Sequence, residues 1–285
     1  MSDARAILKR AGLSPKKSFG QNFLVSPHVV ESIARACVPD GDVGKARVLE
    51  LGAGLGVLTR ALTARAASVV AVERDRDLVP ILSEELSADV ESGRLRIVEG
   101  DAQAASPGEL LGEERSGEPR VLCGNLPYQI TGRLIERAVT GAADVDRVVF
   151  MVQLEVADRL AAEPGSKTYG ALSVFVQAAF RVRKLFNVSP GSFHPPPDVT
   201  SAVVSLEPER PARAEETETF RALVKGAFGA RRKTLRNAWS NVASSDLIAR
   251  AAEQSGISLD ARGETLGVDQ YAAMAKALDA ARAAG

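Results

Sequence analysis

Short hydrophobic runs recur along the first two-thirds of the chain, and Gly-rich or polar stretches separate them. Five runs have the length and hydrophobic content of short buried strands: residues 47–51, 68–73, 95–98, 121–123 and 146–152. Residues 57–66, 77–90 and 131–142 have helical spacing instead. Strands that alternate with helices predict an α/β fold with a mostly parallel sheet and helices on both faces.

The pattern changes after residue 180. Residues 181–188 and 201–206 read as two late strands around a Pro-rich loop, and we expect them to form an antiparallel edge of the sheet. The prolines of residues 207–211 oppose both helix and central strand, which is typical of a linker. From residue 217 the chain reads as helical and ends Ala-rich. We therefore predict two domains, 1–210 and a small all-helical 211–285.

The overall composition indicates no function, but the distribution of charge along the chain indicates a kind of partner. The 285 residues are 45% hydrophobic and 25% charged, with a formal net charge of zero, which is ordinary for a globular chain. Residues 1–36 carry six Lys or Arg against two acids, residues 221–236 carry six against none, and residues 73–118 carry thirteen acids against five bases. Basic ends around an acidic middle favour a localised nucleic-acid contact, although solvated helix faces commonly cause such runs.

The cysteines and histidines exclude several kinds of site. Cys37 and Cys123 lack metal-ligand spacing and read as small apolar residues of a reducing compartment. His28 and His194 lie far apart in sequence, so neither a zinc site nor a His-based triad is supported. No run reaches the length of a membrane span, and the N-terminal residues lack a signal-peptide core. We expect a cytoplasmic protein without metal or membrane contact.

A Gly-rich turn follows the first strong strand and opens a helix. Residues 50–56 read Glu-Leu-Gly-Ala-Gly-Leu-Gly, and glycines there let a ligand approach the backbone closely. Glu73 ends the next strand, twenty-one residues after Gly52, where a carboxylate can accept hydrogen bonds from both hydroxyls of a ribose. A dinucleotide fingerprint would need glycine where Val57 stands. The alternative is a tight turn with a surface glutamate.

A further carboxylate follows the strand at 95–98. Asp101 is placed at the same sheet edge as Gly52 and Glu73, and it can accept a hydrogen bond from an adenine amino group. The three features describe an adenosine-shaped cleft. Because no second phosphate-binding element is evident, S-adenosylmethionine fits this cleft better than NAD.

Residues 125–128 read Asn-Leu-Pro-Tyr and follow the strand at 121–123. Asn and Pro are common turn formers, so the tetrapeptide alone is compatible with an ordinary turn. With four other motifs in the same order, it resembles the ribosomal RNA adenine N6-dimethyltransferases, and residues 231–237 resemble the branch that acts on small-subunit RNA. The match runs from about residue 16 to about 275, and its motifs are residues 19–24, 50–54, 125–128, 193–201 and 231–237.

The resemblance implies a class I methyltransferase (Rossmann-like) sheet in residues 1–210, as the catalytic domain that binds S-adenosylmethionine, and a small helical C-terminal domain in residues 211–285 that binds RNA or the ribosome. It further implies S-adenosylmethionine as methyl donor. The substrate would be 16S rRNA in the small ribosomal subunit or its precursor, where two adjacent adenosines near the 3′ end each receive two methyl groups. A role in ribosome biogenesis follows, and we expect a monomer.

The resemblance also assigns residues. Those expected at the cofactor are Asn22, Leu24, Gly52, Gly54, Glu73, Asp101, Ala102 and Asn125, and those expected at the target base are Asn125, Leu126, Pro127, Tyr128 and Phe193. The basic residues expected to contact RNA phosphates are Lys16, Lys17, Arg231, Arg232, Lys233 and Arg236.

The chemistry explains the residue types of the tetrapeptide. The N6 amine of adenine is a poor nucleophile because its lone pair is delocalised into the ring. The Asn125 side-chain carbonyl and the main-chain carbonyl of Leu126 or Pro127 can accept its two hydrogens. Tyr128 supplies a stacking face for the extruded base, and Phe193 a second one. The amine is neutral, so no general base is needed before methyl transfer.

Three alternatives remain open at this point. A large-subunit 23S rRNA methyltransferase of macrolide-resistance type more often has Ile in place of Leu126 and lacks the basic tail motif. An assembly factor without catalysis is disfavoured by the intact Asn125, Glu73 and Asp101. A DNA adenine methyltransferase commonly has Asp in place of Asn125.

Overall fold

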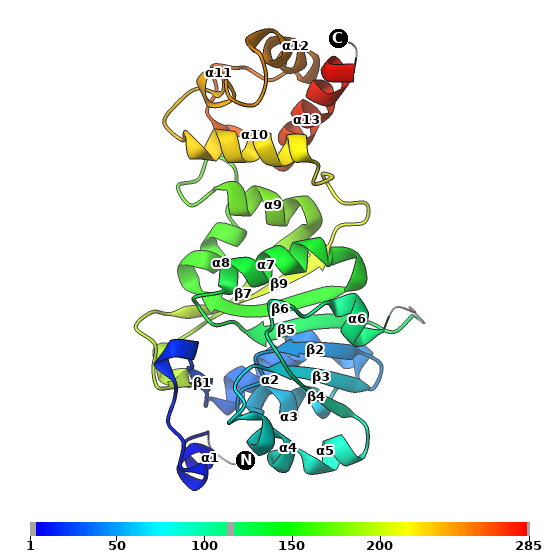
Figure 1. Cartoon of the computed structure of the whole chain (residues 1–285), viewed down its shortest axis with the longest axis vertical. Coiled ribbons are helices and arrows are strands. Elements are labelled where there is room, and N and C mark those ends of the chain that lie inside the picture. The colour runs from blue at the N-terminus through cyan, green and yellow to red at the C-terminus, as the bar shows by residue number, and fades with distance from the viewer. Residues whose placement is uncertain (1–3, 113–116, 284–285) are drawn as a thin grey trace. The chain divides into compact units, whose positions relative to one another are not determined.

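The computed structural model describes residues 4–112 and 117–283, apart from the side chain of Lys17 (Figure 1). The chain divides into two compact units. Unit 1 combines Met1–Ala157 with Arg183–Pro208, and unit 2 combines Asp158–Val182 with Glu209–Gly285. The helical segment before the late strands therefore packs with the C-terminal helices, whereas the sequence grouped it with residues 1–210. The assignment of catalysis and RNA binding to these ranges stays a prediction.

A seven-stranded sheet forms the centre of unit 1, in the order β4-β3-β2-β5-β6-β9-β7. The first five strands in this order are parallel, and β9 runs antiparallel to β6. The expected antiparallel edge is therefore present. The bounds are β2 Arg47–Leu51, β3 Ser68–Glu73, β4 Leu95–Glu99, β5 Arg120–Asn125, β6 Arg147–Gln153, β7 Phe180–Val188 and β9 Ser201–Pro208.

Burial explains why the strand predictions succeed. The central strands β2, β3, β5 and β6 are buried along nearly their whole length, as parallel strands covered on both faces must be. Strand β4, at the edge, is mostly exposed or half-buried. The expected linker at 207–211 begins later than predicted, because β9 continues through Pro208. Pro208 is the last residue of β9 and lies past Leu206, the last residue in register with β6, so its missing N–H removes no hydrogen bond to that strand.

The predicted helix at 77–90 is two helices, which corrects the sequence-based expectation. Helix α4 ends at Glu85 and α5 begins at Ser87, because Leu86 leaves the helical region with φ −122° and ψ 26°. Its side chain is buried, so core packing overrides a continuous helical spacing. Both helices lie beside β4 in Figure 1. The helices of unit 1 are α1 Ala4–Ala11, α2 Pro27–Cys37, α3 Val57–Thr63, α4 Val79–Glu85, α5 Ser87–Glu91, α6 Pro107–Leu111 and α7 Thr131–Thr140.

A short two-stranded sheet fixes the N-terminal segment of unit 1. Strand β1, Phe23–Leu24, pairs antiparallel with β8, Phe193–His194, and Leu24 lies opposite Phe193. Phe23 packs in a small apolar cluster with Leu8 of α1 and Leu55 of the Gly-rich loop. The segment that follows α1 is therefore anchored at its far end by both backbone pairing and apolar contact.

Unit 2 is helical and has its own core. Trp239 is fully buried there, and its indole nitrogen donates to the carbonyl of Leu223 at 2.8 Å. It packs edge to face with Tyr271, so it is a core residue of unit 2. Within the described ranges, no helix is both long and apolar enough to span a bilayer. The helices that lie wholly in this unit are α9 Ala171–Ala179, α10 Glu218–Gly229, α11 Leu235–Ala238, α12 Ser245–Ser255 and α13 Val268–Ala283, and α8 Leu154–Leu160 leads into it.

Candidate functional site

A cavity of about 150 Å³ opens at the carboxyl edge of the parallel strands in unit 1. Its lining comes from the ends of β2, β3 and β5, from the turn after β4, and from residues 18–24 of the N-terminal segment. Of the residues predicted at the cofactor and the target base, all except Phe193 line it: Asn22, Leu24, Gly52, Gly54, Glu73, Asp101, Ala102, Asn125, Leu126, Pro127 and Tyr128.

The Gly-rich loop after β2 needs glycine for two reasons. Gly52, Gly54 and Gly56 have φ of 77°, 58° and 76°, a left-handed conformation that costs other residues energy. A Cβ at Gly56 would also lie 2.6 Å from the Leu82 side chain, and one at Gly54 would lie 3.3 Å from the Phe23 ring. The loop is therefore both tightly turned and closely packed, which leaves its backbone facing the cavity.

Glu73 ends β3 and is held by the backbone on both of its oxygens. The amide of Gly54 donates to Oε2 at 2.7 Å, and the amide of Asp75 donates to Oε1 at 2.8 Å. The side chain is only 8% exposed, and burial raises its pKa because the amide hydrogen bonds offset the lost hydration only in part. Each carboxylate oxygen has a second lone pair, so Glu73 can still accept both hydroxyls of a ribose.

Asp101 lies in the turn after β4 with its carboxylate partly open to solvent. The amide of Gln103 donates to Oδ1 at 2.9 Å, and the Arg74 guanidinium lies 3.8 Å from Oδ2. With 37% of its side chain exposed, the carboxylate can still be reached by a ligand amine. Arg74, which sequence reasoning did not single out, also lines the cavity.

Asn125 is oriented by the N-terminal segment. Its Nδ2 donates to the backbone carbonyl of Asn22 at 3.1 Å, so its side-chain oxygen is left as an acceptor. The sequence left open whether Leu126 or Pro127 supplies the second acceptor. The Pro127 carbonyl accepts the Thr131 hydroxyl at 3.0 Å and the Ile130 amide at 3.1 Å, and in the part of the chain that the structure describes no donor bonds the Leu126 carbonyl. Leu126 is thus the better second acceptor.

The two aromatic residues expected at the base lie in different environments. Tyr128 lines the cavity, and its hydroxyl and that of Ser201 form a hydrogen bond of 2.9 Å. Burial raises the Tyr128 pKa, and the bond with Ser201 only partly opposes this. Phe193 is instead 1% exposed, belongs to the hydrophobic core of unit 1 and lies opposite Leu24 in the β1–β8 pair. Its contact with a base stays a prediction, and its observed role is to support β1.

Glu50 is a cavity residue that the sequence reasoning missed. It is 2% exposed, and Thr59 donates a hydroxyl hydrogen bond to its Oε2 at 2.6 Å. Burial raises the pKa of Glu50 to about 8. The hydrogen bond from Thr59 opposes this rise, and the negative charge of Glu73 adds to it. Glu50 therefore remains largely protonated at neutral pH. Its place at the end of a buried strand, directly before the glycines, was the available signal.

Lys16 does not present a free ammonium group. Its Nζ lies 2.6 Å from Asp75 Oδ1 and 2.6 Å from Asp77 Oδ2. The pKa of Lys16 is raised by these hydrogen bonds, that with Asp75 being the larger cause. The predicted phosphate contact of Lys16 would have to compete with both carboxylates. The side chain of Lys17 lies outside the described part.

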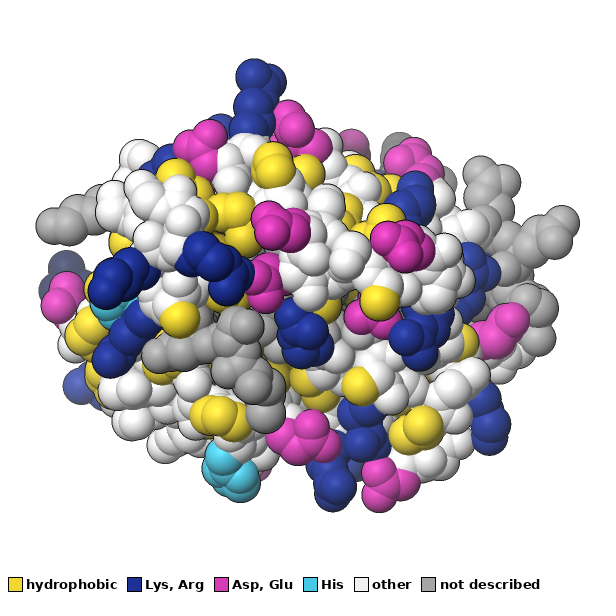
Figure 2. All heavy atoms as spheres, turned by 90° about the horizontal axis from the view of Figure 1, so that it is seen from below, with side chains coloured by type: hydrophobic (Ala, Val, Ile, Leu, Met, Phe, Trp, Pro, Cys, Tyr) yellow, Lys and Arg dark blue, Asp and Glu magenta, His cyan; other side chains and the backbone are white. Residues whose placement is uncertain are grey.

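The four basic residues of the tail motif lie in unit 2 and differ in their partners. Arg231 donates to the backbone carbonyls of Lys167 at 2.8 Å and Tyr169 at 3.1 Å, and Arg236 lies 3.7 Å from Asp260. Arg232 and Lys233 are exposed. Arg232 and Lys233 are therefore the best placed of the four to contact a phosphate. Figure 2 shows the face seen from below Figure 1, where Lys and Arg side chains are interspersed with Asp and Glu.

Three comparisons with known proteins show the family and the fold of the chain. The family model described as "Ribosomal RNA adenine dimethylase" matches residues 12–280. The chain belongs to this family. It is 43% identical to "Ribosomal RNA small subunit methyltransferase A" of Anaeromyxobacter sp. (strain K), over 96% of this chain and 97% of that protein. It is also 43% identical to the protein of the same name from Geobacter metallireducens, over 95% and 98%.

The solved structures support the fold. A dimethyladenosine transferase from Plasmodium falciparum aligns with a TM-score of 0.74 and 23% identity, covering 88% of this chain and 95% of that chain. The 23S rRNA methyltransferase ErmE aligns with a TM-score of 0.68 and 24% identity, covering 90% and 100%. The family, the class I methyltransferase fold and the enzyme class, an rRNA adenine dimethyltransferase, are confirmed. Among the described residues, no group of three or more His, Cys, Asp or Glu is placed to hold a metal ion.

Proposed function

We propose that this enzyme transfers methyl groups from S-adenosylmethionine to the N6 amines of two adjacent adenosines near the 3′ end of 16S rRNA. The observation that carries the proposal is the meeting of Glu73, Asp101 and the oriented Asn125 amide around one cavity. The small-subunit substrate is supported by the printed name of the 43%-identical relatives. We further propose that it acts in the cytoplasm as a monomer, during small-subunit biogenesis.

The cavity residues fit S-adenosylmethionine. Glu73 offers two carboxylate oxygens to a ribose diol, and Asp101 offers a carboxylate to the adenine amino group. The left-handed glycines allow the methionine portion to approach the backbone without meeting a Cβ. When bound, the cofactor supplies a methyl group on a sulfonium, which the N6 lone pair takes as a neutral thioether leaves.

The chain's own residues position the amine. The Asn125 side-chain oxygen and the Leu126 carbonyl accept its two N–H groups, which holds the nitrogen in place and favours its rehybridisation. Tyr128, held through Ser201, presents a ring on which the extruded base stacks, and such stacking is worth about 1–3 kcal/mol. The proton leaves to water after transfer. Positioning and fixed dipoles account for the rate enhancement, without a general base.

A neutral amide is sufficient at this position. Positive charge moves from the sulfonium to the N6 nitrogen and then leaves as a proton. Because the total charge of the reacting atoms stays the same until the proton leaves, transfer does not depend on a fixed negative charge beside them, and the Asn125 oxygen needs only to accept an N6 hydrogen.

Binding of RNA is proposed for unit 2. Arg232 and Lys233 are exposed within the basic tail motif, and phosphate contacts of this kind give position and affinity without reading sequence. The zero net charge of the whole chain suggests that recognition depends on the shape of a ribosomal surface. Equal activity on free 16S rRNA and on assembled subunits would contradict this last point.

The deciding experiment is transfer of labelled methyl groups to unmodified small and large ribosomal subunits in parallel. We expect close to four methyl groups per small subunit, recovered as N6,N6-dimethyladenosine, and none on the large subunit. Labelling of the large subunit alone would instead establish the macrolide-resistance type of activity. Binding to small subunits without labelling would indicate an assembly factor that has lost catalysis.

A further inference from the structure

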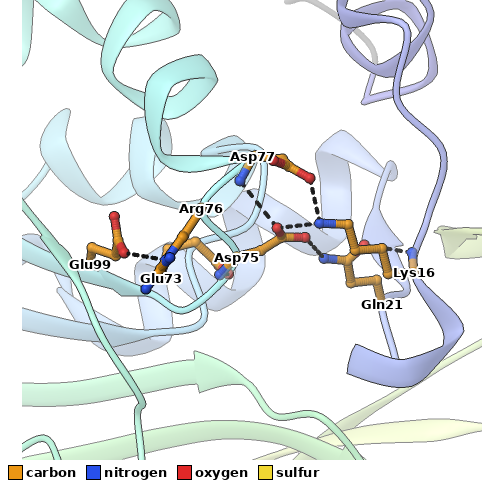
Figure 3. Close-up of polar contacts among 7 residues, drawn as sticks. All are labelled: Lys16, Gln21, Glu73, Asp75, Arg76, Asp77 and Glu99. Atoms are coloured by element: carbon orange, nitrogen blue, oxygen red, sulfur yellow. Dashed lines mark hydrogen bonds and ion pairs between the residues drawn. The ribbon is translucent and has the colours of Figure 1, made fainter.

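A polar network joins the N-terminal segment to the turn after β3 (Figure 3). Asp75 accepts hydrogen bonds from Lys16 Nζ at 2.6 Å and from Gln21 Nε2 at 2.7 Å. Gln21 in turn accepts the backbone amide of Lys16 at 2.8 Å through Oε1. Three side chains thus close a ring of contacts between parts of the chain that lie more than fifty residues apart in sequence.

We propose that Lys16, Gln21 and Asp75 form a latch that holds residues 16–24 against the cofactor cavity. The three are positioning residues for cofactor binding and for the orientation of Asn125, and do not themselves touch the reacting atoms. The proposal rests on the proposed function, because it assigns the cavity to S-adenosylmethionine.

The connections of the latch support this role. On one side, the amide of Asp75 donates to Glu73, the carboxylate proposed to bind the ribose. On the other side, the segment continues to Asn22, whose carbonyl accepts the side-chain amide of Asn125. The latched segment therefore bridges from the ribose end of the cavity to its catalytic end, and residues 18–24 form part of the cavity wall.

The segment has little else to hold it where the latch lies. Its regular structure is a single 3₁₀ turn, Lys17–Phe19, and the two-residue strand β1. The Phe19 ring is half-buried and lies 5.5 Å from both the Lys16 ammonium and the Arg74 guanidinium. These cation–π contacts add to the same attachment. Loss of the latch would thus loosen the cavity wall while leaving the sheet intact.

The ion pair of the latch, Lys16–Asp75, is partly shielded from solvent. The Asp75 side chain is 4% exposed and that of Lys16 35% exposed, so the pair is screened less than a surface pair. Burial alone would raise the pKa of Asp75, but hydrogen bonds from Lys16, Gln21 and the Asp77 amide outweigh it and lower the pKa. The neighbouring pair Arg76–Glu99, also drawn in Figure 3, has side chains 85% and 50% exposed. Arg76 lies in the same turn as Asp75 and Glu99 ends β4. Among the described residues no hydrogen bond or ion pair joins either of them to residues 16–24, which makes the pair a matched control.

The test measures binding of S-adenosylmethionine by isothermal titration calorimetry to the full-length protein. For Lys16→Met and Asp75→Asn we expect about tenfold weaker binding each, the effect of losing one charge-assisted hydrogen bond. The double variant should be little worse than either single variant, because both remove the same interaction. Lys16→Arg, which keeps the charge, should bind nearly as the wild type does, and the control Arg76→Met should change affinity by less than about twofold.

Kinetics separate positioning from RNA binding. We expect Lys16→Met to raise the KM for S-adenosylmethionine and lower kcat, through the lost orientation of Asn125, while the KM for the small subunit stays the same. Unchanged cofactor affinity with a higher subunit KM and a shallower salt dependence would overturn the latch and make Lys16 a phosphate contact.

Two further outcomes separate a failure of the latch from a variant that does not fold and from a failure of the proposed function. If Lys16→Met fails to fold, Gln21→Leu removes the Gln21 hydrogen bond to the Asp75 carboxylate and the acceptor of the Lys16 amide without removing a charge, and it should still weaken cofactor binding several-fold; wild-type affinity in a folded Gln21→Leu protein would overturn the latch. If the wild type itself does not bind S-adenosylmethionine, the proposed function fails and the role of the latch fails with it.

Discussion

The buried carboxyl group of Glu50 should make the stability of unit 1 depend on pH. Its pKa is about 8 in the folded chain, against an ordinary value of 4.5. Between these values the folded state holds a proton that the unfolded state has lost. The free energy of unfolding therefore falls as pH rises through this window, and it levels off above the folded pKa. The variant Glu50→Gln keeps the size and an acceptor for Thr59, and it cannot ionise.

The magnitude follows from the shift. One pKa unit corresponds to about 1.4 kcal/mol, so the contribution of Glu50 should fall by at most about 1.4 kcal/mol per pH unit. Between pH 6 and pH 8 the wild type should thus lose roughly 2–3 kcal/mol of stability relative to Glu50→Gln. The pH dependence of other groups is common to both proteins and cancels in the difference.

The measurement is urea unfolding of both proteins, without cofactor, at several pH values from 6 to 8.5. Circular dichroism follows the whole chain, while fluorescence of Trp239, the one tryptophan, reports unit 2. The difference in free energy of unfolding between the wild type and Glu50→Gln should change with pH in the transition of unit 1. Circular dichroism follows this transition, and Trp239 fluorescence does not report it. Glu99→Gln, at a half-exposed carboxyl on β4, is the matched control, and its difference should stay nearly constant. A pH-independent difference for Glu50→Gln would refute the protonated state of Glu50.

Three further predictions test the site and its supports. Asn125→Ala should lower kcat at least about 100-fold, measured by methyl transfer to small subunits, while urea unfolding shows a loss of only about 1 kcal/mol for the bond to Asn22; near-normal turnover would contradict the mechanism. Gly124→Ala should lower the free energy of unfolding in urea by about 1–3 kcal/mol, because the added Cβ would lie 2.5 Å from the Leu51 carbonyl oxygen. It should also reduce activity, because residue 124 directly precedes Asn125. An unchanged urea midpoint would show that the two strands shift without cost. Arg232→Ala combined with Lys233→Ala should weaken binding to small subunits and flatten its salt dependence without changing thermal unfolding, whereas Arg231→Ala should lower the unfolding temperature because it loses two backbone acceptors.

Much of unit 1 was predictable because its determinants are local or follow from parallel-sheet geometry. The short hydrophobic runs at residues 47–51 and 68–73 match β2 and β3, since strands buried on both faces need a largely apolar sequence. The meeting of Gly52, Glu73, Asp101 and Asn125 was predictable as well, because parallel strands bring their carboxyl ends to one edge. The break between α4 and α5 was not, since the burial of Leu86 comes from packing.

The sequence by itself determined the fold class, the family and the identity of the groups that meet at the cavity. The tertiary structure alone decided the state of those groups. Lys16 carries the local signature of a phosphate contact, yet its charge is taken up by Asp75, fifty-nine residues away. In the sequence Glu50 is an ordinary glutamate at the end of a strand, whereas in the folded chain burial removes its hydration and raises its pKa. The physical reason is common to both residues: hydration and charge partners come from segments distant along the chain, and these set the pKa and availability of a side chain.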